Sequence, residues 1–305
     1  SSSFKDCKNL HKIEFSENSE LHSIDSFAFS SSAIKSILIP VKVRQICEAT
    51  FSNCLKLHNI EFSENSELYS INNFAFNSSS IVKILIPSKV QLIGSNAFAN
   101  CQKIQSIEFS EDSELKFIGE NAFESSSIEK VSIPSHVQKI GSSAFKDCQK
   151  LKSIDFVNNS ELRTIESFLF NSSSIENIII PQKVERICSH AFSNCKKLKT
   201  ISFDKQSKIQ MIEKSAFNSS SIIELTIPSE VENLDEESLI NIHNLTNIKI
   251  ESNNKHYIYH NNELLLYKTN HTKSSNDKDN QFDKIIFVRR DIEKVIIPSF
   301  VKEIG

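Results

Sequence analysis

Cysteine recurs at every 47th residue over the first two thirds of the chain, as Cys7, Cys54, Cys101, Cys148 and Cys195. Thiols in such a series can form disulfide bonds or bind a metal ion if the fold brings them together. A disulfide bond requires Cα atoms within about 7 Å of each other. The structural element that repeats with the cysteines therefore decides whether they can react with one another.

Carboxylates form a second series with possible chemistry. The segment Ser-Glu-Asn-Ser-Glu occurs at 16–20 and 63–67, and Ser-Glu-Asp-Ser-Glu occurs at 110–114. Stacked carboxylates can hold calcium through oxygen ligands. These segments lack the glycine-rich turns of calcium-binding solenoids, and the copy at 204–208 has lost most of the charge. We interpret the series as a solvated edge and expect no metal site.

Histidines do not combine with other groups into an active site. His256 and His260 lie four residues apart, but they fall in an expected strand, where they are too far apart to bind one metal. The chain has no His-Glu-x-x-His motif, no phosphate-binding glycine loop and no nucleophile elbow. We predict that the protein is not an enzyme and has no catalytic residue, no metal ligand and no cofactor.

Each 47-residue unit divides into two similar halves that begin with an apolar triplet such as Leu10-x-x-Ile13-x-Phe15. The triplets begin at positions 10, 34, 57, 81, 104, 128, 151, 175, 198, 222 and 245, and a twelfth begins at 292. Their alternating pattern indicates short strands with one buried face. The step of 24 or 23 residues is too short for a strand and a full crossover helix. Each half is therefore one coil of a solenoid, whose strands pair in parallel about 4.8 Å apart.

This stacking predicts the roles of the other repeated residues. Equivalent cysteines lie two coils, or about 9–10 Å, apart, so we expect all seven cysteines to be reduced. Gly94 and Gly141 share a turn position at which a positive φ is expected. One phenylalanine per coil should form a stacked spine, namely Phe4, Phe29, Phe51, Phe76, Phe98, Phe123, Phe145, Phe170, Phe192 and Phe217.

Composition and the ends of the chain limit the other possibilities. The chain has 305 residues and a formal net charge of -3, and its interspersed charges do not favour nucleic-acid binding. It has no run of 18 apolar residues, so no membrane span is expected in this segment. The continuous period predicts one elongated domain over 1–305. Because both ends interrupt a repeat, we expect a fragment of a longer chain without obvious capping units.

The period breaks once, over 251–291. The residues from His256 to Tyr267 predict a β-hairpin with a polar turn at Asn261 and Asn262. A polar segment from Thr269 to Asp279 is expected to be a mobile loop. Residues 284–288 should form a strand before the array resumes. This insertion is either a second candidate site or a structural element that bridges the break.

The repeated pattern resembles that of a known family. Residues Ile84 to Cys101 read Ile-x-Ile-Pro-x-x-Val-x-x-Ile-x-x-x-Ala-Phe-x-x-Cys, which is similar to the BspA-like, Treponema-type leucine-rich repeat. The resemblance implies an α/β-type leucine-rich-repeat solenoid, curved and right-handed, with a parallel concave sheet and a mostly short helical or irregular convex side. It also implies a location on bacterial or protozoan cell surfaces, adhesion to host cells and matrix proteins, and no catalytic motif.

The middle residue of each triplet should point outward from the concave sheet. Acidic residues alternate there with aliphatic ones. The candidate partner-binding residues are Glu14, Leu38, Glu61, Leu85, Glu108, Asp155 and Ile179. One interpretation is a mixed apolar and acidic binding strip. The other is a sheet whose aliphatic residues support strand pairing and whose charges maintain solubility.

We therefore predict a protein–protein interaction module, in a cell-surface or secreted adhesin that binds host or extracellular matrix proteins through its concave face. The alternative is a cytoplasmic scaffold or adaptor. Sequons give only weak support for secretion, because they arise by chance in a chain rich in asparagine and serine. They are Asn77, Asn158, Asn171, Asn218, Asn244 and Asn270.

Overall fold

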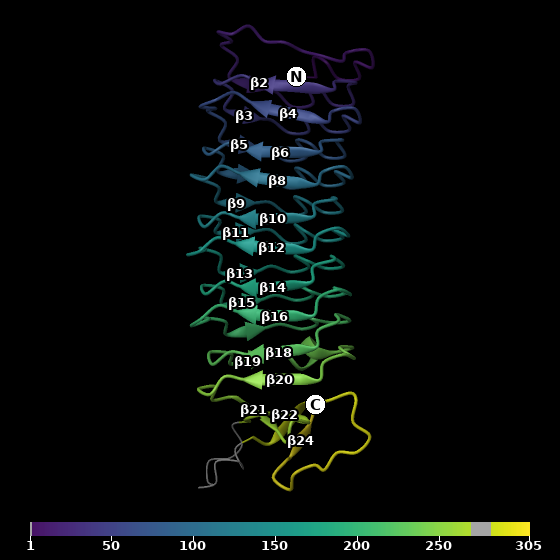
Figure 1. Ribbon diagram of the computed structural model, residues 1–305, viewed down its shortest axis with the longest axis vertical. Coiled ribbons are helices and arrows are strands. Elements are labelled where there is room, and N and C mark those ends of the chain that lie inside the picture. Colours follow the sequence, from purple (N-terminus) through teal and green to yellow (C-terminus); the bar gives the residue numbers. More distant parts are fainter. Residues whose placement is uncertain (1, 270–281) are drawn as a thin grey trace.

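The computed structural model describes residues 2–269 and 282–305. The chain winds into coils that stack into an elongated column (Figure 1). A typical coil carries a four-residue strand on one side and a two-residue strand on another, with turns between them. All strand pairs within 2–250 are parallel, as in the pairing of β6 (Lys83–Ile86) with β8 (Ser106–Phe109). The predicted parallel solenoid is confirmed.

The four-residue strands form the long-strand face of the column. In β6, Ile84 and Ile86 are buried, whereas Lys83 and Leu85 are exposed, which is the predicted alternation. The first triplet contributes only an isolated bridge between Lys12 and Ser36. The other long strands are β2 (Ser36–Ile39), β4 (Asn59–Phe62), β10 (Lys130–Ile133), β12 (Ser153–Phe156), β14 (Asn177–Ile180), β16 (Thr200–Phe203), β18 (Glu224–Ile227) and β20 (Asn247–Ile250).

Two-residue strands lie where a mostly short helical or irregular convex side was expected. They are β1 (Ser23–Ile24), β3 (Gln45–Ile46), β5 (Ser70–Ile71), β7 (Leu92–Ile93), β9 (Phe117–Ile118), β11 (Lys139–Ile140), β13 (Thr164–Ile165), β15 (Arg186–Ile187), β17 (Met211–Ile212) and β19 (Asn233–Leu234). In the described part of the chain the one helix is the 3₁₀ segment η1 (Glu236–Leu239), so the α/β label is not supported.

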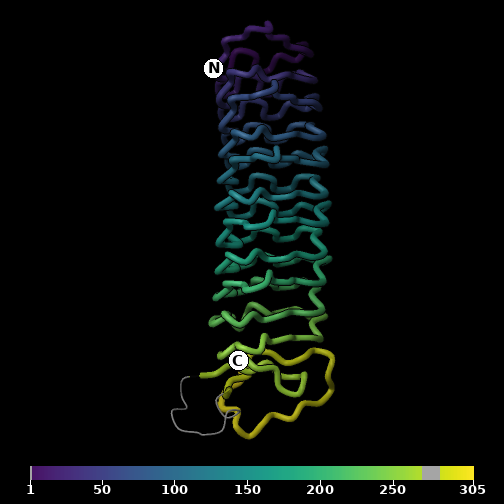
Figure 2. Tube along the Cα trace, turned by 60° about the vertical axis from the view of Figure 1, so that its left-hand side comes forward, coloured from purple at the N-terminus to yellow at the C-terminus, as the bar shows by residue number. Residues whose placement is uncertain are grey.

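The column is nearly straight in two views 60° apart, so the expected curvature is not seen (Figures 1 and 2). Curvature arises when helices, about 10 Å across, stack on one side and strands, about 4.8 Å apart, stack on the other. Here both sides are strands, most of which pair with their neighbours, and the spacing on the two sides is therefore similar. Because the column is not curved, the side with the four-residue strands is called the long-strand face and not the concave face.

The predicted phenylalanine spine is confirmed. From Phe4 to Phe217 each ring stacks on the next, with centroids 5.0–5.8 Å apart. All seven cysteines are free thiols, as predicted. Each buried thiol of the ladder is fixed by the preceding coil; for example, Cys101 Sγ donates to the carbonyl oxygen of Phe76 at 3.1 Å.

The glycine prediction is wrong. No glycine in the described residues has a positive φ. A Cβ atom on Gly94 would lie 2.6 Å from the backbone of Asn72, and one on Gly141 would lie 2.5 Å from the backbone nitrogen of Glu120. Glycine therefore stands at this position because the neighbouring coil approaches its backbone closely.

Positive φ values fall instead mostly on asparagine and serine in the turns. Asn96 and Asn100 have φ of 58° and 59°. Asparagine tolerates this left-handed conformation better than most residues. In the three sequons that share a repeat position, the serine after the asparagine has a positive φ and donates to the asparagine side chain, as Ser78 does to Asn77. The folded turns thus explain these asparagine–serine pairs without glycosylation.

A separate four-stranded sheet, the small sheet, covers the end of the array after β20 (Figure 1). Strands β21 (Tyr257–His260) and β22 (Leu264–Tyr267) form an antiparallel hairpin, β22 pairs antiparallel with β23 (Lys284–Val288), and β23 pairs in parallel with β24 (Glu303–Ile304). The triplet at 292 forms no strand, and Ile296 is 76% exposed. The array resumes only in part: the turn from Pro298 to Val301 recurs as in the earlier coils, and the short strand β24 pairs in parallel with β23. The loop expected from Thr269 to Asp279 and the sequon at Asn270 lie almost wholly outside the described residues.

Tyr257 closes the core at this end. Its side chain is buried. Its hydroxyl accepts a hydrogen bond from the backbone N–H of Leu234 at 2.8 Å and donates to the carbonyl oxygen of Glu232 at 3.3 Å. Leu234 lies in β19, which is the last strand of its sheet. Without Tyr257, the backbone N–H of Leu234 would point to the position of a further coil. The insertion therefore caps the solenoid, which the sequence did not indicate.

Candidate functional site

The seven predicted binding residues all lie on the outward side of the long-strand face. All seven side chains are exposed. The parallel register places the middle residues of neighbouring strands directly beside each other, as in Leu38 beside Glu61 and Leu85 beside Glu108. Farther along, Asp155 lies beside Ser132, and Ile179 lies beside Ser202. The structure thus brings the predicted residues into one row, which we call the outward row.

The aliphatic members of the outward row are far more exposed than their neighbours in the strands. Leu38, Leu85 and Ile179 are 51%, 54% and 63% exposed, whereas Ile84, next to Leu85, is 3% exposed. No other element of the described chain covers these three side chains. They are therefore apolar surface available to a partner, and they add nothing to the buried core.

Hollows follow the outward row at intervals of two coils. Each hollow has a proline-containing coil at its floor, and a longer loop rises beside it. The hollow at Leu38 has a volume of about 780 Å³, and those at Leu85, Ser132 and Ile179 measure about 590, 740 and 710 Å³. Consecutive hollows share lining residues, such as Glu61 between the first and second, so they form one interrupted groove.

The loops beside the hollows are held by their serines. Ser63 Oγ donates to the carbonyl oxygen of Ile39, and Ser66 Oγ accepts from the backbone N–H of Leu68. Asn65 has a φ of 59°, a conformation that suits asparagine. The second glutamate, Glu67, accepts a hydrogen bond from Arg44 Nε at 3.1 Å. The first glutamate of the loop, Glu64, has no partner among the described residues.

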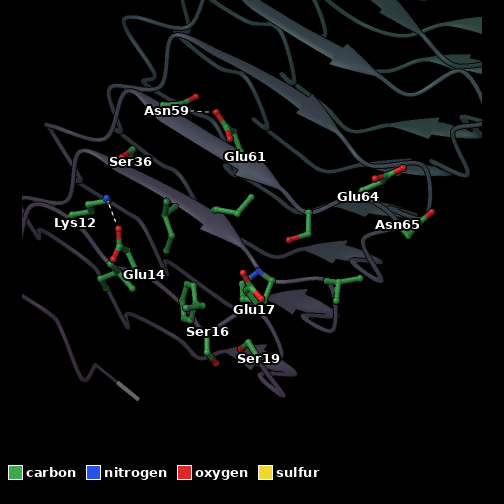
Figure 3. Close-up of a pocket in the computed structure, with 17 residues that line it drawn as sticks. Lys12, Glu14, Ser16, Glu17, Ser19, Ser36, Asn59, Glu61, Glu64 and Asn65 are labelled. Atoms are coloured by element: carbon green, nitrogen blue, oxygen red, sulfur yellow. Dashed lines mark hydrogen bonds and ion pairs between the residues drawn. The ribbon is translucent and has the colours of Figure 1, made fainter.

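The same division recurs in the flanking loops. The second glutamates, Glu20 and Glu114, bond to Lys42 and Gln91 of a neighbouring coil. The first glutamates, Glu17 and Glu111, are exposed and lie beside hollows without a partner in the described structure. Figure 3 shows Glu17 and Glu64 on the loops of one hollow, with Glu61 on β4 and Glu14 on the extended segment after Lys12.

Sequence reasoning missed these loop glutamates because it interpreted the whole loop as a solvated edge. The signal was present in the repeat itself. In the copy at 63–67 the two serines, Asn65 and Glu67 each contribute to the turn or to a bond with a neighbouring coil, and Glu64 does not.

The electrostatics of the outward row change along the column. Lys12 forms an ion pair with Glu14 and lowers the pKa of that carboxyl. Asn59 Nδ2 donates to Glu61 at 2.9 Å. Beyond Asp155, serine and then lysine replace the acidic residues at the equivalent strand position, at Ser202 and Lys249. The acidic part of the row therefore coincides with the hollows described above.

Phenylalanines form a weaker candidate surface on the turn side. Phe27, Phe74 and Phe168 are each 39% exposed and have φ values of 58–60°. A bulky residue rarely adopts this conformation. Between Phe74 and Phe168 the equivalent positions carry Asn121 and other small polar residues, so the three rings are not contiguous.

The 251–291 insertion contributes a different hollow, of about 700 Å³, where the small sheet meets the array. Lys284 lies beside it and forms ion pairs with Glu236 and Glu303. Lys284 of the insertion is thus paired with acidic residues on either side of it, unlike the loop glutamates. Over residues 2–269 and 282–305, no three histidine, cysteine or acidic side chains converge as metal ligands would. Nor do these ranges contain a helix long and apolar enough to cross a bilayer.

Comparison with known proteins places this geometry in context. The model described as the BspA type leucine rich repeat region matches residues 1–84, 69–175 and 163–264. No curated protein matches the sequence. A leucine-rich repeat protein from Bacteroides ovatus is similar in structure, with a TM-score of 0.51 and 22% identity over 75% of this chain and 64% of the other.

Two further solved structures are more distant. The pneumococcal vaccine antigen PcpA has a TM-score of 0.47 and 24% identity over 72% of this chain, which spans 63% of the antigen's chain. A leucine rich cell surface protein from Faecalibacterium prausnitzii has a TM-score of 0.39 and 17% identity, over 90% of this chain and 87% of the other. At these identities the likeness concerns the fold.

Proposed function

Because the chain belongs to the BspA-type leucine-rich repeat family, we propose that it is a protein-interaction module of a cell-surface protein, which binds a host or extracellular matrix protein through the outward row. The cell-surface location rests on the association of this family with surface proteins. The proposal assigns the chain a binding role without catalysis, with Glu14, Leu38, Glu61, Leu85, Glu108, Asp155 and Ile179 as contact residues.

One observation carries the proposal: uncovered aliphatic side chains alternate with carboxylates along a row of hollows. Leu38, Leu85 and Ile179 supply apolar area, and the acidic residues between and beside them supply a polar rim. Protein interfaces combine an apolar centre with such a rim. The unpartnered loop glutamates support the same assignment, because they contribute nothing to the fold.

Binding to immobilised matrix proteins and host-cell preparations tests the proposal. Leu38→Glu combined with Leu85→Glu places unpaired charge at the centre of the contact and should abolish binding, while the fold remains intact because both side chains are exposed. The insertion supplies buried Tyr257 to the core, so deleting it would confuse unfolding with loss of contact. Lys255→Glu with Arg290→Glu changes its exposed surface instead and should leave binding unchanged.

The opposite result would assign the contact surface to the insertion and not to the outward row. If the Lys255→Glu and Arg290→Glu protein loses binding while the Leu38→Glu and Leu85→Glu protein retains it, the insertion is the contact surface. Immunostaining of intact, unpermeabilised cells checks the location separately. Staining that requires permeabilisation would contradict the cell-surface role and favour the cytoplasmic scaffold.

A further inference from the structure

The spacing of the hollows limits the shape of what they can bind. Leu38 and Leu85 lie 47 residues and two coils apart. Neighbouring strands are about 4.8 Å apart, so equivalent hollows recur about every 9.6 Å. The parallel register keeps the hollows in line, and the column is nearly straight (Figures 1 and 2). A ligand that occupies several hollows must therefore be straight and repeat its contacts every 9.6 Å or so.

Regular polypeptide conformations differ in how well they meet this requirement. A polyproline II helix has three residues per turn and rises about 3.1 Å per residue, so every third side chain lies on one side about 9.3 Å apart. A β-strand presents same-side residues about 6.7 Å apart. In an α-helix the nearest match is every seventh residue, about 10.5 Å apart. From Leu38 to Ile179 there are three such intervals of two coils. Over this length, the difference between the ligand's side-chain repeat and the spacing of the hollows adds up to about 1 Å for polyproline II and nearly 3 Å for the α-helix.

The charges around the hollows indicate the second property of the ligand. The first hollow is lined by Glu14, Glu17, Glu61 and Glu64 but by one lysine, Lys12, which is paired with Glu14. The third is lined by five carboxylates, Lys130 and His136. Glu17, Glu64 and Glu111 have no partner among the described residues, so they are free to accept charged donors from a ligand. Lysine and arginine complement this surface.

We infer that the outward row binds an extended, positively charged segment in the polyproline II conformation, with an apolar side chain at every third position. The apolar side chains enter successive hollows at Leu38, Leu85 and beyond, and the intervening lysine or arginine residues reach the loop glutamates. This inference rests on the proposed function and names the class of partner that the outward row recognises.

A peptide of four Leu-Pro-Lys triplets, labelled with fluorescein, is the probe. Its matched control has the same residues, reordered so that the leucines stand alternately two and four residues apart. Fluorescence anisotropy should show that the regular peptide binds about tenfold more tightly than the control, or better. Replacing each lysine with glutamate should remove binding, and added salt should weaken the binding of the regular peptide.

Variants of the protein locate the binding. Leu85→Asn should lower the affinity for the regular peptide about tenfold. Leu55→Asn removes a side chain that is 67% exposed but lies outside the hollows, and it should have no effect. Equal binding of the regular and reordered peptides, or an unchanged affinity of Leu85→Asn, would overturn the inference. If no peptide binds while Leu38→Glu with Leu85→Glu still abolishes binding to the matrix preparation, the ligand class is wrong and the proposed function stands.

Discussion

The phenylalanine spine and the outward row share one period and have opposite relations to solvent. Phe98 and its neighbours in the spine are buried and stack on each other, whereas Leu38, Leu85 and Ile179 are 51%, 54% and 63% exposed. The spine continues coil by coil from Phe4 to Phe217. In the outward row, exposed aliphatic residues stand only in alternate coils, and Ser132 replaces one of them. The comparison shows that the repeat has two periods with separate roles. Residues that recur in each coil form the core of the column, and residues that recur in every second coil form its outward surface.

The largest effect should come from the spine. Phe98→Ala should cost about 3–5 kcal/mol, because it leaves a cavity between two stacked rings. Since each coil contacts only its neighbours, the loss should appear as increased hydrogen exchange in the coils from 81 to 150. Phe117→Ala is the matched control, because Phe117 is 43% exposed, and its effect should be much smaller. Similar exchange in the two variants would remove the distinction between buried and exposed rings.

The end of the core should be the next most sensitive. Tyr257→Phe removes the hydroxyl that accepts from Leu234 and leaves a buried backbone N–H unsatisfied, which costs about 1–3 kcal/mol. Urea denaturation measures the loss, and faster exchange of the Leu234 amide locates it. Tyr259→Phe removes a more exposed hydroxyl, bonded to the carbonyl oxygen of Asn262, and should cost less. Equal losses would show that Tyr257 does not cap the array.

The buried thiols predict that the stability of the fold depends on pH. Burial raises the pKa of Cys101 to about 11 and that of Cys148 to about 12, from 9.0. The folded chain therefore holds these protons more tightly than the unfolded chain. The stabilisation is present below pH 9 and is lost as the pH rises toward 11 or 12.

The difference in free energy of unfolding between wild type and Cys148→Ala should therefore shrink above pH 9. Denaturation of both proteins at pH 8 and pH 10.5 measures this change. A difference that stays constant with pH would mean that the Cys148 thiol is not desolvated. Wild-type protein at pH 8 should also react with iodoacetamide at the more accessible Cys7 before the buried thiols do.

The smallest effect on stability should come from the outward row. Leu38→Glu with Leu85→Glu should change the free energy of unfolding by no more than about 0.5 kcal/mol per site, as surface substitutions do. Ile84→Glu, one residue from Leu85 but buried, should prevent folding of that coil. A large loss of stability in the double variant would place Leu38 and Leu85 in the packing and remove the outward row as a binding surface.

Periodic features could be predicted from the sequence because burial and strand pairing repeat with the residues that cause them. The triplets gave the parallel strands, the spine and the free thiols, and the alternation within each triplet placed the predicted contact residues on one outward row. Features that depend on contacts between distant segments could not be predicted. Gly94 is required by the backbone of Asn72 in the preceding coil, and no local pattern shows that approach.

The C-terminal region shows the same limit more strongly. The triplet at 292 has the correct apolar spacing, but the hairpin and β23 come between it and β20, the last long strand, so the spacing alone did not produce a strand. The family resemblance predicted a mostly short helical or irregular convex side. Short strands and left-handed turns, mostly at asparagine and serine, occupy it here.

The two-coil period also has a genetic consequence. Because each coil contacts only its neighbours, duplication or loss of one 47-residue unit changes the length of the column without disturbing the remaining coils. Such an event adds or removes one hollow together with its loop glutamate. Recombination between the copies can therefore adjust the number of contacts made with an elongated partner, and hence avidity, without altering any single contact.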